Sequence, residues 1–158
     1  ENAAKCPLTL SVISHIPDCT TAMFSVLGPG KYVPPHRGIY KGTHRCLLSI
    51  IVPNQDKCWL KVQDKRLQFR EGEAIVFDET FLHEAANETD SPRVVLYLDI
   101  YRKFPFPLNV FNKIIFAALR NSPFIQNVLK EYRYLDPVTI MDSPRELKNN
   151  ANSEHLTR

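Results

Sequence analysis

Short β-prone runs separated by turn formers occupy the chain from Thr21 to about Ile100. Segments such as Gly28-Pro29-Gly30 and Glu71-Gly72 favour the backbone angles of tight turns. This spacing leaves no room for the long helices of a βαβ fold, and it is typical of an all-β barrel or jelly roll. We expect strands over Ala22 to Leu27, Arg45 to Val52, Cys58 to Val62, Arg66 to Phe69, Ala74 to Phe77 and Arg93 to Tyr101.

Apolar residues at helical spacing flank this β region. Leu8, Val12 and Ile16 recur every four residues behind an early proline, which predicts a short helix over residues 7–16 that packs on the domain and ends at Pro17. After Pro105-Phe106-Pro107 a second helical face appears, and a further short helix is expected over residues 123–132. The second face consists of Leu108, Phe111, Ile115, Ala118 and Leu119.

This apolar helical face admits two interpretations. It packs against the outside of the β-sandwich, or residues 104–120 make a peripheral contact with a membrane or a partner. The chain is predicted to form one domain over residues 1–136, with a β core over about 20–102 and C-terminal helices over about 107–132. Residues 137–158 are polar, offer little to bury and are expected to form a mostly disordered tail.

Charge, cysteine content and hydropathy bear on the partners and the cellular location of the protein. The 20 basic and 17 acidic residues are spread along the chain without a run of five like charges, so no nucleic-acid partner is expected. The four cysteines lack C-x-x-C spacing, which favours free thiols in a reducing compartment. No run approaches the roughly 20 apolar residues that span a bilayer. We therefore expect a cytoplasmic protein, with peripheral membrane contact as the alternative.

Two of the five histidines, His36 and His83, fall at strand edges inside the β region. In a double-stranded β-helix, a His before one inner strand and a His several strands later meet at the mouth of the barrel, where neutral imidazoles suit divalent iron. An isolated pair of histidines is weak support for a metal site, so the surrounding segments decide the interpretation.

Those segments resemble the aspartyl/asparaginyl β-hydroxylase family, whose members include hydroxylases of aspartyl residues in proteins and of lipid A acyl chains. The resemblance extends in collinear order over about residues 20–102 and implies a double-stranded β-helix (a cupin-like jelly roll) with short flanking α-helices. The matching stretches are Ala22 to Gly30, Val33 to Gly38, Phe77 to Asp90 and Arg93 to Asp99.

The resemblance implies a role for each matching residue. His36 and His83 would hold iron(II), and Arg93 would pair with the distal carboxylate of 2-oxoglutarate through its rigid fork of donors. Ser25 and Arg45 fall where the family places further cosubstrate contacts. Dioxygen would be the second cosubstrate.

The sequence departs from the wider class of oxygenases at Gly38, where most members have an acidic third ligand. The aspartyl hydroxylase branch also has glycine here, whereas the lipid A branch typically has aspartate, so Gly38 favours the former. Asp78 and Glu79 are candidates to orient a water on the open metal position, or ordinary polar residues at a strand end.

A second departure is Leu47, which stands where the family commonly has a cosubstrate-binding histidine. His44 is the nearest polar alternative in the sequence. Either His44 or another group replaces the missing donor, or 2-oxoglutarate binds more weakly, or the site has lost its activity.

These residues predict an iron(II)- and 2-oxoglutarate-dependent dioxygenase that hydroxylates an aspartyl- or asparaginyl-type side chain in a peptide or small molecule. The alternatives are a hydroxylase of lipid acyl chains at a membrane face and a catalytically silent cupin-like binding module. Residues expected at the mouth, which would favour an acidic or phosphorylated substrate or else form solvated surface, are Arg37, Tyr40, Lys41 and Arg102.

Overall fold

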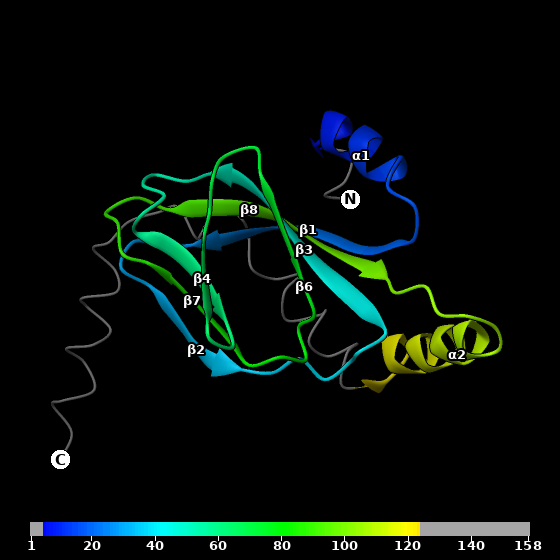
Figure 1. The fold of residues 1–158 in the computed structure, drawn as a ribbon. Coiled ribbons are helices and arrows are strands. Elements are labelled where there is room, and N and C mark those ends of the chain that lie inside the picture. The colour runs from blue at the N-terminus through cyan, green and yellow to red at the C-terminus, as the bar shows by residue number, and fades with distance from the viewer. Residues whose placement is uncertain (1–4, 124–158) are drawn as a thin grey trace, which may run out of the picture. The chain divides into compact units, whose positions relative to one another are not determined.

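Eight antiparallel strands form two four-stranded sheets in the part of the chain that the computed structural model describes, residues 5–123 (Figure 1). The first sheet has the order β1-β8-β3-β6 and the second has the order β2-β7-β4-β5. The strands are β1 (Cys19–Leu27), β2 (Tyr32–His36), β3 (Thr43–Ile51), β4 (Cys58–Val62), β5 (Lys65–Gln68), β6 (Ala74–Phe77), β7 (His83–Asn87) and β8 (Arg93–Tyr101).

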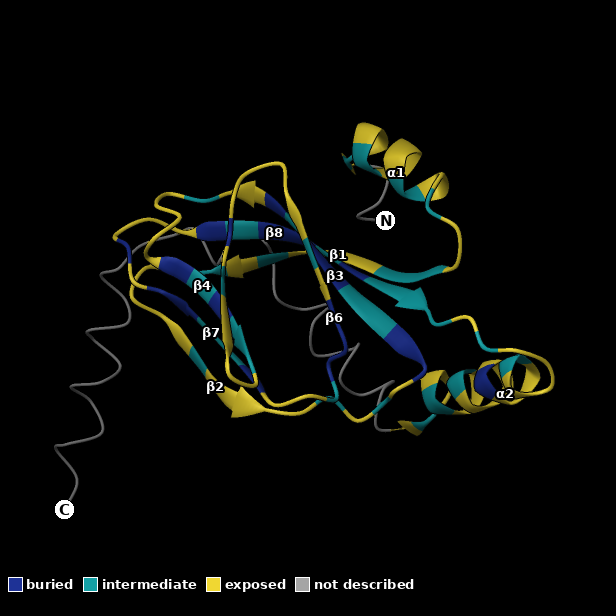
Figure 2. Cartoon of the chain, viewed as in Figure 1, coloured by how far each residue is buried: buried dark blue, intermediate teal, exposed yellow. Residues whose placement is uncertain are grey.

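The inner faces of the two sheets share one hydrophobic core. Strand residues alternate between faces, so Leu47 on β3 and Val95 on β8 point inward, where they join Leu60 and Phe69 from the β4–β5 hairpin. Buried residues accordingly concentrate on the facing strands (Figure 2). Two antiparallel four-stranded sheets closed over a common core form a double-stranded β-helix, as the sequence predicted.

The outer face of the first sheet has its own apolar cluster, made by Cys46, Leu96 and Leu98. Helix α1 (Pro7–Ser14) confirms the predicted N-terminal helix, although it ends three residues before Pro17. Its contacts with this cluster come from Ile13 and, beyond the helix, Ile16. Leu8 and Val12, whose spacing predicted the helix, are 83% and 58% exposed.

Six predicted strands are confirmed, three of them (β4, β6 and β8) with the expected first and last residues. The two strands that carry His36 and His83 were not predicted. β2 contains Pro34 and Pro35, which cannot donate to a ladder, and β7 is built from His, Glu, Ala and Asn, residues other than the β-branched and aromatic types enriched in strands. Pairing with their neighbours, and not local propensity, makes these segments strands.

Residues 106–123 belong to a different unit from the one that ends at Pro105. Its helix α2 (Leu108–Arg120) matches the predicted helix. Leu108, Phe111 and Ile115 are each more than half exposed, and the buried side chain of the helix is Asn112. The expected helix over 123–132, the boundary at 136 and the tail extend beyond Pro123, outside the described residues.

Cys6, Cys19, Cys46 and Cys58 are all free thiols. Neither helix within residues 5–123 is long and apolar enough to cross a membrane.

Candidate metal and anion site

His36 and His83 lie opposite each other on the paired strands β2 and β7. The ladder shifts register between Val33 and His36, where Pro34 and Pro35 lack the N–H groups that a regular ladder needs. With this shift the two imidazole rings face each other, with centroids 4.1 Å apart. His36 is exposed to solvent whereas His83 is buried, so the pair is reached from outside on the His36 side.

Both imidazoles present the same nitrogen for metal binding. Nδ1 of His36 lies 2.9 Å from the Pro34 carbonyl oxygen, and Nδ1 of His83 lies 2.8 Å from the Phe81 carbonyl oxygen. Because a carbonyl only accepts, each Nδ1 carries the proton and each Nε2 keeps a lone pair for a metal. Burial lowers the pKa of His83, and the Arg45 charge lowers it further, whereas the hydrogen bond to the Phe81 carbonyl raises it; the net lowering favours the neutral imidazole that a metal ligand must be.

Within residues 5–123 no group of three or more His, Cys, Asp or Glu side chains is arranged to hold a metal. The residue that could have completed a triad, Gly38, donates its amide hydrogen to the Glu79 carbonyl oxygen at 2.7 Å. A Cβ added at Gly38 would overlap Cγ and Cδ of Glu79 and lie 2.7 Å from its Oε2. The Glu79 side chain therefore occupies the space that a ligand side chain at residue 38 would need.

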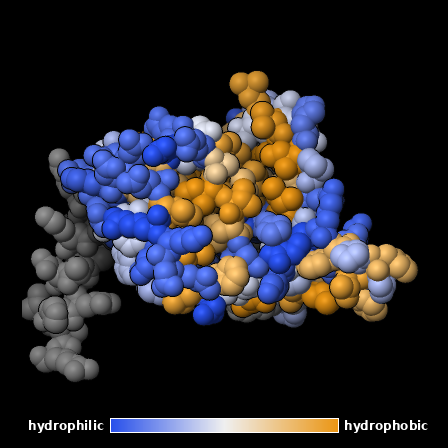
Figure 3. Space-filling view, viewed as in Figure 1, coloured by the Kyte–Doolittle hydropathy of each residue, from blue (hydrophilic) through white to orange (hydrophobic). Residues whose placement is uncertain are grey.

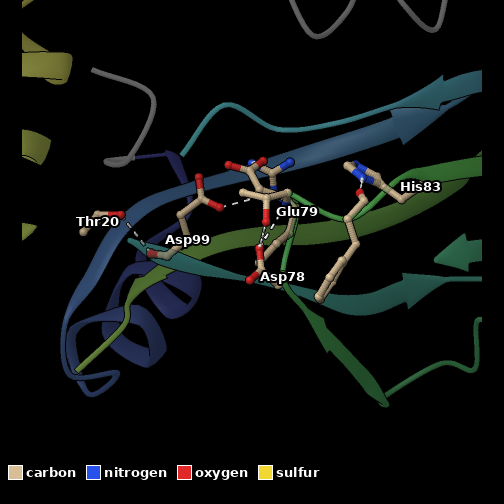
Figure 4. A network of polar contacts seen from close by, with 8 residues as sticks. Thr20, Asp78, Glu79, His83 and Asp99 are labelled. Atoms are coloured by element: carbon tan, nitrogen blue, oxygen red, sulfur yellow. Dashed lines mark hydrogen bonds and ion pairs between the residues drawn. The ribbon is translucent and has the colours of Figure 1, made fainter. Parts of the chain in front are cut away.

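The Glu79 carboxylate is buried and held by Arg45, which also bonds Asp99 through Nε at 3.2 Å (Figure 4). Burial raises the pKa of Glu79, and the Arg45 charge opposes that rise. Arg45 in turn lies over the Tyr97 ring, 4.3 Å from its centroid. Arg45, predicted to contact the cosubstrate, thus has two acidic partners in the protein already.

Asp78 has different partners. Its Oδ1 accepts from the Thr80 hydroxyl at 2.6 Å and from the Thr80 amide at 3.0 Å, and its Oδ2 pairs with Arg102 at 2.6 Å. Burial alone would raise the pKa of Asp78, but the bonds from Thr80 and Arg102 outweigh it and lower the pKa. Asp78 therefore stabilises the turn before β7, and both of its carboxylate oxygens already have partners in the protein.

Arg93 is a buried cation without an anion among the described residues. It is 5% exposed, its Nε has no hydrogen-bond partner, and its Cζ lies 4.5 Å from the centroid of the Phe69 ring. Burial lowers the pKa of Arg93 to about 10, so the guanidinium is still charged at neutral pH. A buried charge is costly unless it is paired, and this geometry therefore suits an anionic ligand.

Ser49, which sequence reasoning missed, lies on the same inner face. It is 1% exposed and its hydroxyl has no hydrogen-bond partner in the described protein. Val95 pairs with Ser49 on one side and with Ser25 on the other, and Arg93 lies two residues before Val95, so strand alternation places all three polar side chains on one face. In the sequence, the spacing of two residues from Arg45 to Leu47 and from Leu47 to Ser49 indicates that Ser49 lies on the same face of the strand as the other two residues.

The same alternation argues against His44 as the replacement for the missing histidine at Leu47. Leu47 is packed in the shared core, whereas His44 lies on the opposite side of β3, with Nδ1 3.5 Å from Arg102. Burial and the Arg102 charge lower the pKa of His44. Two polar side chains flank Leu47 at the same spacing on the correct face. Arg45 is already paired with Glu79 and Asp99, so Ser49 is the one with an unpartnered group.

The four residues predicted at the mouth have different surroundings. Arg37 is exposed and donates to the Thr80 carbonyl oxygen at 3.0 Å, and Lys41 is exposed. Tyr40 is half-buried, and burial raises its pKa. Arg102 pairs with Asp78. A shared role in substrate binding stays a prediction for these four residues.

Comparison with known proteins assigns the chain to a family. The model of the aspartyl/asparaginyl β-hydroxylase family matches residues 1–103. An ornithine lipid ester-linked acyl 2-hydroxylase from Rhizobium tropici is 38% identical over 134 residues, which cover 84% of this chain and 48% of that protein. The human aspartyl/asparaginyl β-hydroxylase is 27% identical over 107 residues, covering 64% of this chain and 14% of that protein.

Among solved structures, the cupin domain of an XRE-family transcriptional regulator from Enterobacter cloacae is similar with a TM-score of 0.44 and 15% identity, covering 52% of this chain and 81% of that one. The chain spans about half the length of the Rhizobium relative and a smaller share of the human one. The family match covers well over half of the chain, from its first residue through the end of β8. The protein therefore belongs to the aspartyl/asparaginyl β-hydroxylase family of hydroxylases.

Proposed function

We propose that this protein is an iron(II)- and 2-oxoglutarate-dependent dioxygenase that hydroxylates an unactivated carbon of its substrate. One combination carries the proposal: two imidazoles with proton-free Nε2 atoms face each other, and a buried guanidinium that has no anionic partner among residues 5–123 borders the same core. The first suits a divalent metal and the second a carboxylate. Family membership supports the same reading.

Iron bound with 2-oxoglutarate and dioxygen supplies the oxidant that converts a C–H bond to C–OH, with succinate and carbon dioxide as the other products. His36 and His83 would hold the metal through Nε2. Gly38 offers no ligand atom, so the two imidazoles would be the ligands that this part of the chain provides. The Glu79 carboxylate, kept in the space beside Gly38 by Arg45, would accept a hydrogen bond from a water bound to the metal and fix its orientation.

Arg93 would bind the distal carboxylate of 2-oxoglutarate, since its guanidinium is buried, charged and lacks an anion in the described protein. The Ser49 hydroxyl would donate a second hydrogen bond to that carboxylate, replacing the donor that Leu47 cannot supply. Ser25, in the same strand row, remains a third candidate contact. The core around these groups would exclude water and strengthen the pairing.

Two substrate classes compete. Glycine at residue 38 favours an aspartyl- or asparaginyl-type side chain, by resemblance to the aspartyl hydroxylase branch. A lipid acyl chain is favoured by the 38% identity to the ornithine lipid acyl hydroxylase over 84% of this chain, compared with 27% to the human aspartyl/asparaginyl enzyme.

Succinate release from 2-oxoglutarate distinguishes these substrates. The purified protein is assayed with iron(II) and ascorbate, first with aspartyl and asparaginyl peptides and then with ester-linked ornithine lipid in detergent micelles. We expect substrate-stimulated release with one class and a mass gain of one oxygen in that substrate. No stimulation by either class, together with failure to bind 2-oxoglutarate, would support the silent binding module instead.

A further inference from the structure

Asn87, the last residue of β7, holds the backbone around Arg93. Its side chain is fully buried, and its Nδ2 lies 2.8–3.0 Å from three backbone carbonyl oxygens, those of Leu27, Gly28 and Ser91. Leu27 is the partner of Arg93 in the β1–β8 ladder, and Ser91 lies two residues before Arg93 in the chain. One amide group therefore fixes both the strand opposite Arg93 and the loop that leads into it.

The oxygen of the same side chain connects to the ring beneath Arg93. Oδ1 of Asn87 accepts from the buried Thr89 hydroxyl at 2.6 Å and from the buried Cys58 thiol at 3.4 Å. Cys58 faces Asn87 in the β4–β7 ladder, and its carbonyl oxygen accepts from the Phe69 amide at 3.2 Å. The guanidinium of Arg93 lies over the fully buried Phe69 ring, 4.5 Å from its centroid. Asn87 is thus linked to both supports of this guanidinium, the backbone that carries it and the ring on which it lies.

The Arg93 side chain depends on these supports for its position. Its Nε has no hydrogen-bond partner among residues 5–123, so no bond from that atom fixes the guanidinium. A long side chain that must be ordered when a ligand binds loses affinity, whereas one held in few rotamers beforehand keeps it. The surface at the end of the β unit where β8 begins is mostly hydrophilic (Figure 3), whereas Arg93 and Asn87 are 5% and 0% exposed. The bonds of Asn87 are therefore shielded from competing water.

We infer that Asn87 is a positioning residue for Arg93 and, through it, sets the affinity of the site for the distal carboxylate of 2-oxoglutarate. The inference rests on the function proposed above, in which Arg93 binds that carboxylate. Asparagine suits this role, because its amide supplies two donor hydrogens and an acceptor oxygen in one plane without a charge. His83, at the other end of β7, lies roughly 13 Å away at about 3.3 Å per residue. We therefore expect Asn87 to affect the binding of 2-oxoglutarate and not that of iron(II).

A purely structural role for Asn87 makes a different prediction. In that case, any variant that lowers stability to the same extent would weaken 2-oxoglutarate binding equally. Leu96→Ala provides this comparison, since Leu96 lies on β8, as Arg93 does, but is buried in the apolar cluster of the outer face. Its truncation lowers stability by an amount comparable to the loss of several buried hydrogen bonds, without altering the inner face.

Calorimetry of the full chain with 2-oxoglutarate in the absence of metal, and anaerobic equilibrium dialysis with iron(II), measure the two affinities separately. Far-UV circular dichroism checks that each variant is folded at the temperature of measurement. We expect Asn87→Ala to lose roughly tenfold in affinity for 2-oxoglutarate, with unchanged affinity for iron(II). Leu96→Ala should bind both ligands like the parent protein.

Thr89 provides a second test that leaves the Asn87 amide in place. Thr89→Val removes the hydroxyl that donates to Asn87 and should weaken 2-oxoglutarate binding roughly threefold. Thr89→Ser keeps the hydroxyl and should bind like the parent protein. If Asn87→Ala does not fold, parent-like affinity in Thr89→Val overturns the inference.

Parent-like affinity for 2-oxoglutarate in folded Asn87→Ala, or an equal loss in Leu96→Ala, would also overturn the inference. The results distinguish this failure from failure of the proposed function. Binding that Arg93→Gln weakens and Asn87→Ala leaves intact removes the positioning role alone. Absence of 2-oxoglutarate binding in the parent protein removes both the proposed role of Arg93 and the inference that rests on it.

Discussion

The side chain of Glu79 fills the volume that a side chain at Gly38 would need, and the Gly38 amide donates to the Glu79 carbonyl oxygen at 2.7 Å. The absence of an acidic ligand at residue 38 is thus accompanied by a carboxylate in the adjoining space. Arg45 holds that carboxylate in place. The two positions form one arrangement, in which glycine is required because glutamate is present.

Substitution of Gly38 by aspartate tests this arrangement. The new side chain would overlap Glu79 in the buried space beside Arg45, and we expect Gly38→Asp to lower the free energy of unfolding by about 1–3 kcal/mol. The double variant Gly38→Asp/Glu79→Gly should recover much of this loss, because it moves the carboxylate without adding volume. Urea denaturation of the three proteins measures both effects. Equal stability of parent and single variant would contradict the overlap.

Ser49→Ala separates a ligand-binding role from a structural role. The hydroxyl is buried without a partner, so its removal should leave the stability unchanged or raise it by up to about 1 kcal/mol. Affinity for 2-oxoglutarate, measured by calorimetry, should fall about tenfold as one buried hydrogen bond is lost. Ser14→Ala, at an exposed position on α1, serves as the control. Unchanged affinity in Ser49→Ala would remove Ser49 from the anion site.

The pH dependence of 2-oxoglutarate binding should depend on Arg93. Burial lowers the pKa of Arg93 to about 10, and only the protonated guanidinium pairs with a carboxylate. Affinity should therefore be insensitive to this group below pH 10 and decline as the pH rises through about 10. Bound 2-oxoglutarate stabilises the charge and so moves the pKa of Arg93 upward in the complex. Calorimetry in the absence of iron follows the decline, and Arg93→Gln should bind weakly without a transition near this pH.

Asn87 should be a principal determinant of stability. Its buried side-chain amide lies within 3.0 Å of the carbonyl oxygens of Leu27, Gly28 and Ser91, and its Oδ1 accepts from the Thr89 hydroxyl at 2.6 Å. Asn87→Ala would leave several of these groups unsatisfied, and we expect a loss of about 2–4 kcal/mol in thermal or urea unfolding. Asn54→Ala, which removes one exposed bond to Asp56, should lose less than about 1 kcal/mol. Comparable losses would contradict this role.

Local pattern was sufficient to predict most of the fold. The strands rich in Val, Ile, Leu and Phe, such as β6 and β8, were predicted with the observed ends because their propensity agrees with their place in the sheets. β2 and β7 were missed because prolines and alanines form strands there only through pairing with neighbours. Resemblance to the family, and not propensity, had drawn attention to the histidines at their ends.

The sequence predicted only part of the candidate site, because only some of its residues fall in motifs that can be recognised along the chain. His36, His83 and Arg93 fall in motifs that can be read along the chain, whereas the partnerships of Arg45 with Glu79 and of Asp78 with Arg102 join strands and loops that only tertiary structure brings together. Ser49 was missed because a single serine in an apolar strand gives no local sign that its hydroxyl lacks a partner.

Anaerobic titration with iron(II) and 2-oxoglutarate, followed by the weak visible charge-transfer band of the chelate, tests the paired-imidazole site most directly. We expect the band to saturate at one iron per chain in the parent protein and in His15→Ala, whose histidine lies just after α1. The band should be absent in His83→Ala, which loses a facing imidazole. A band of full amplitude in folded His83→Ala, or none in the parent protein, would contradict the assignment of this site.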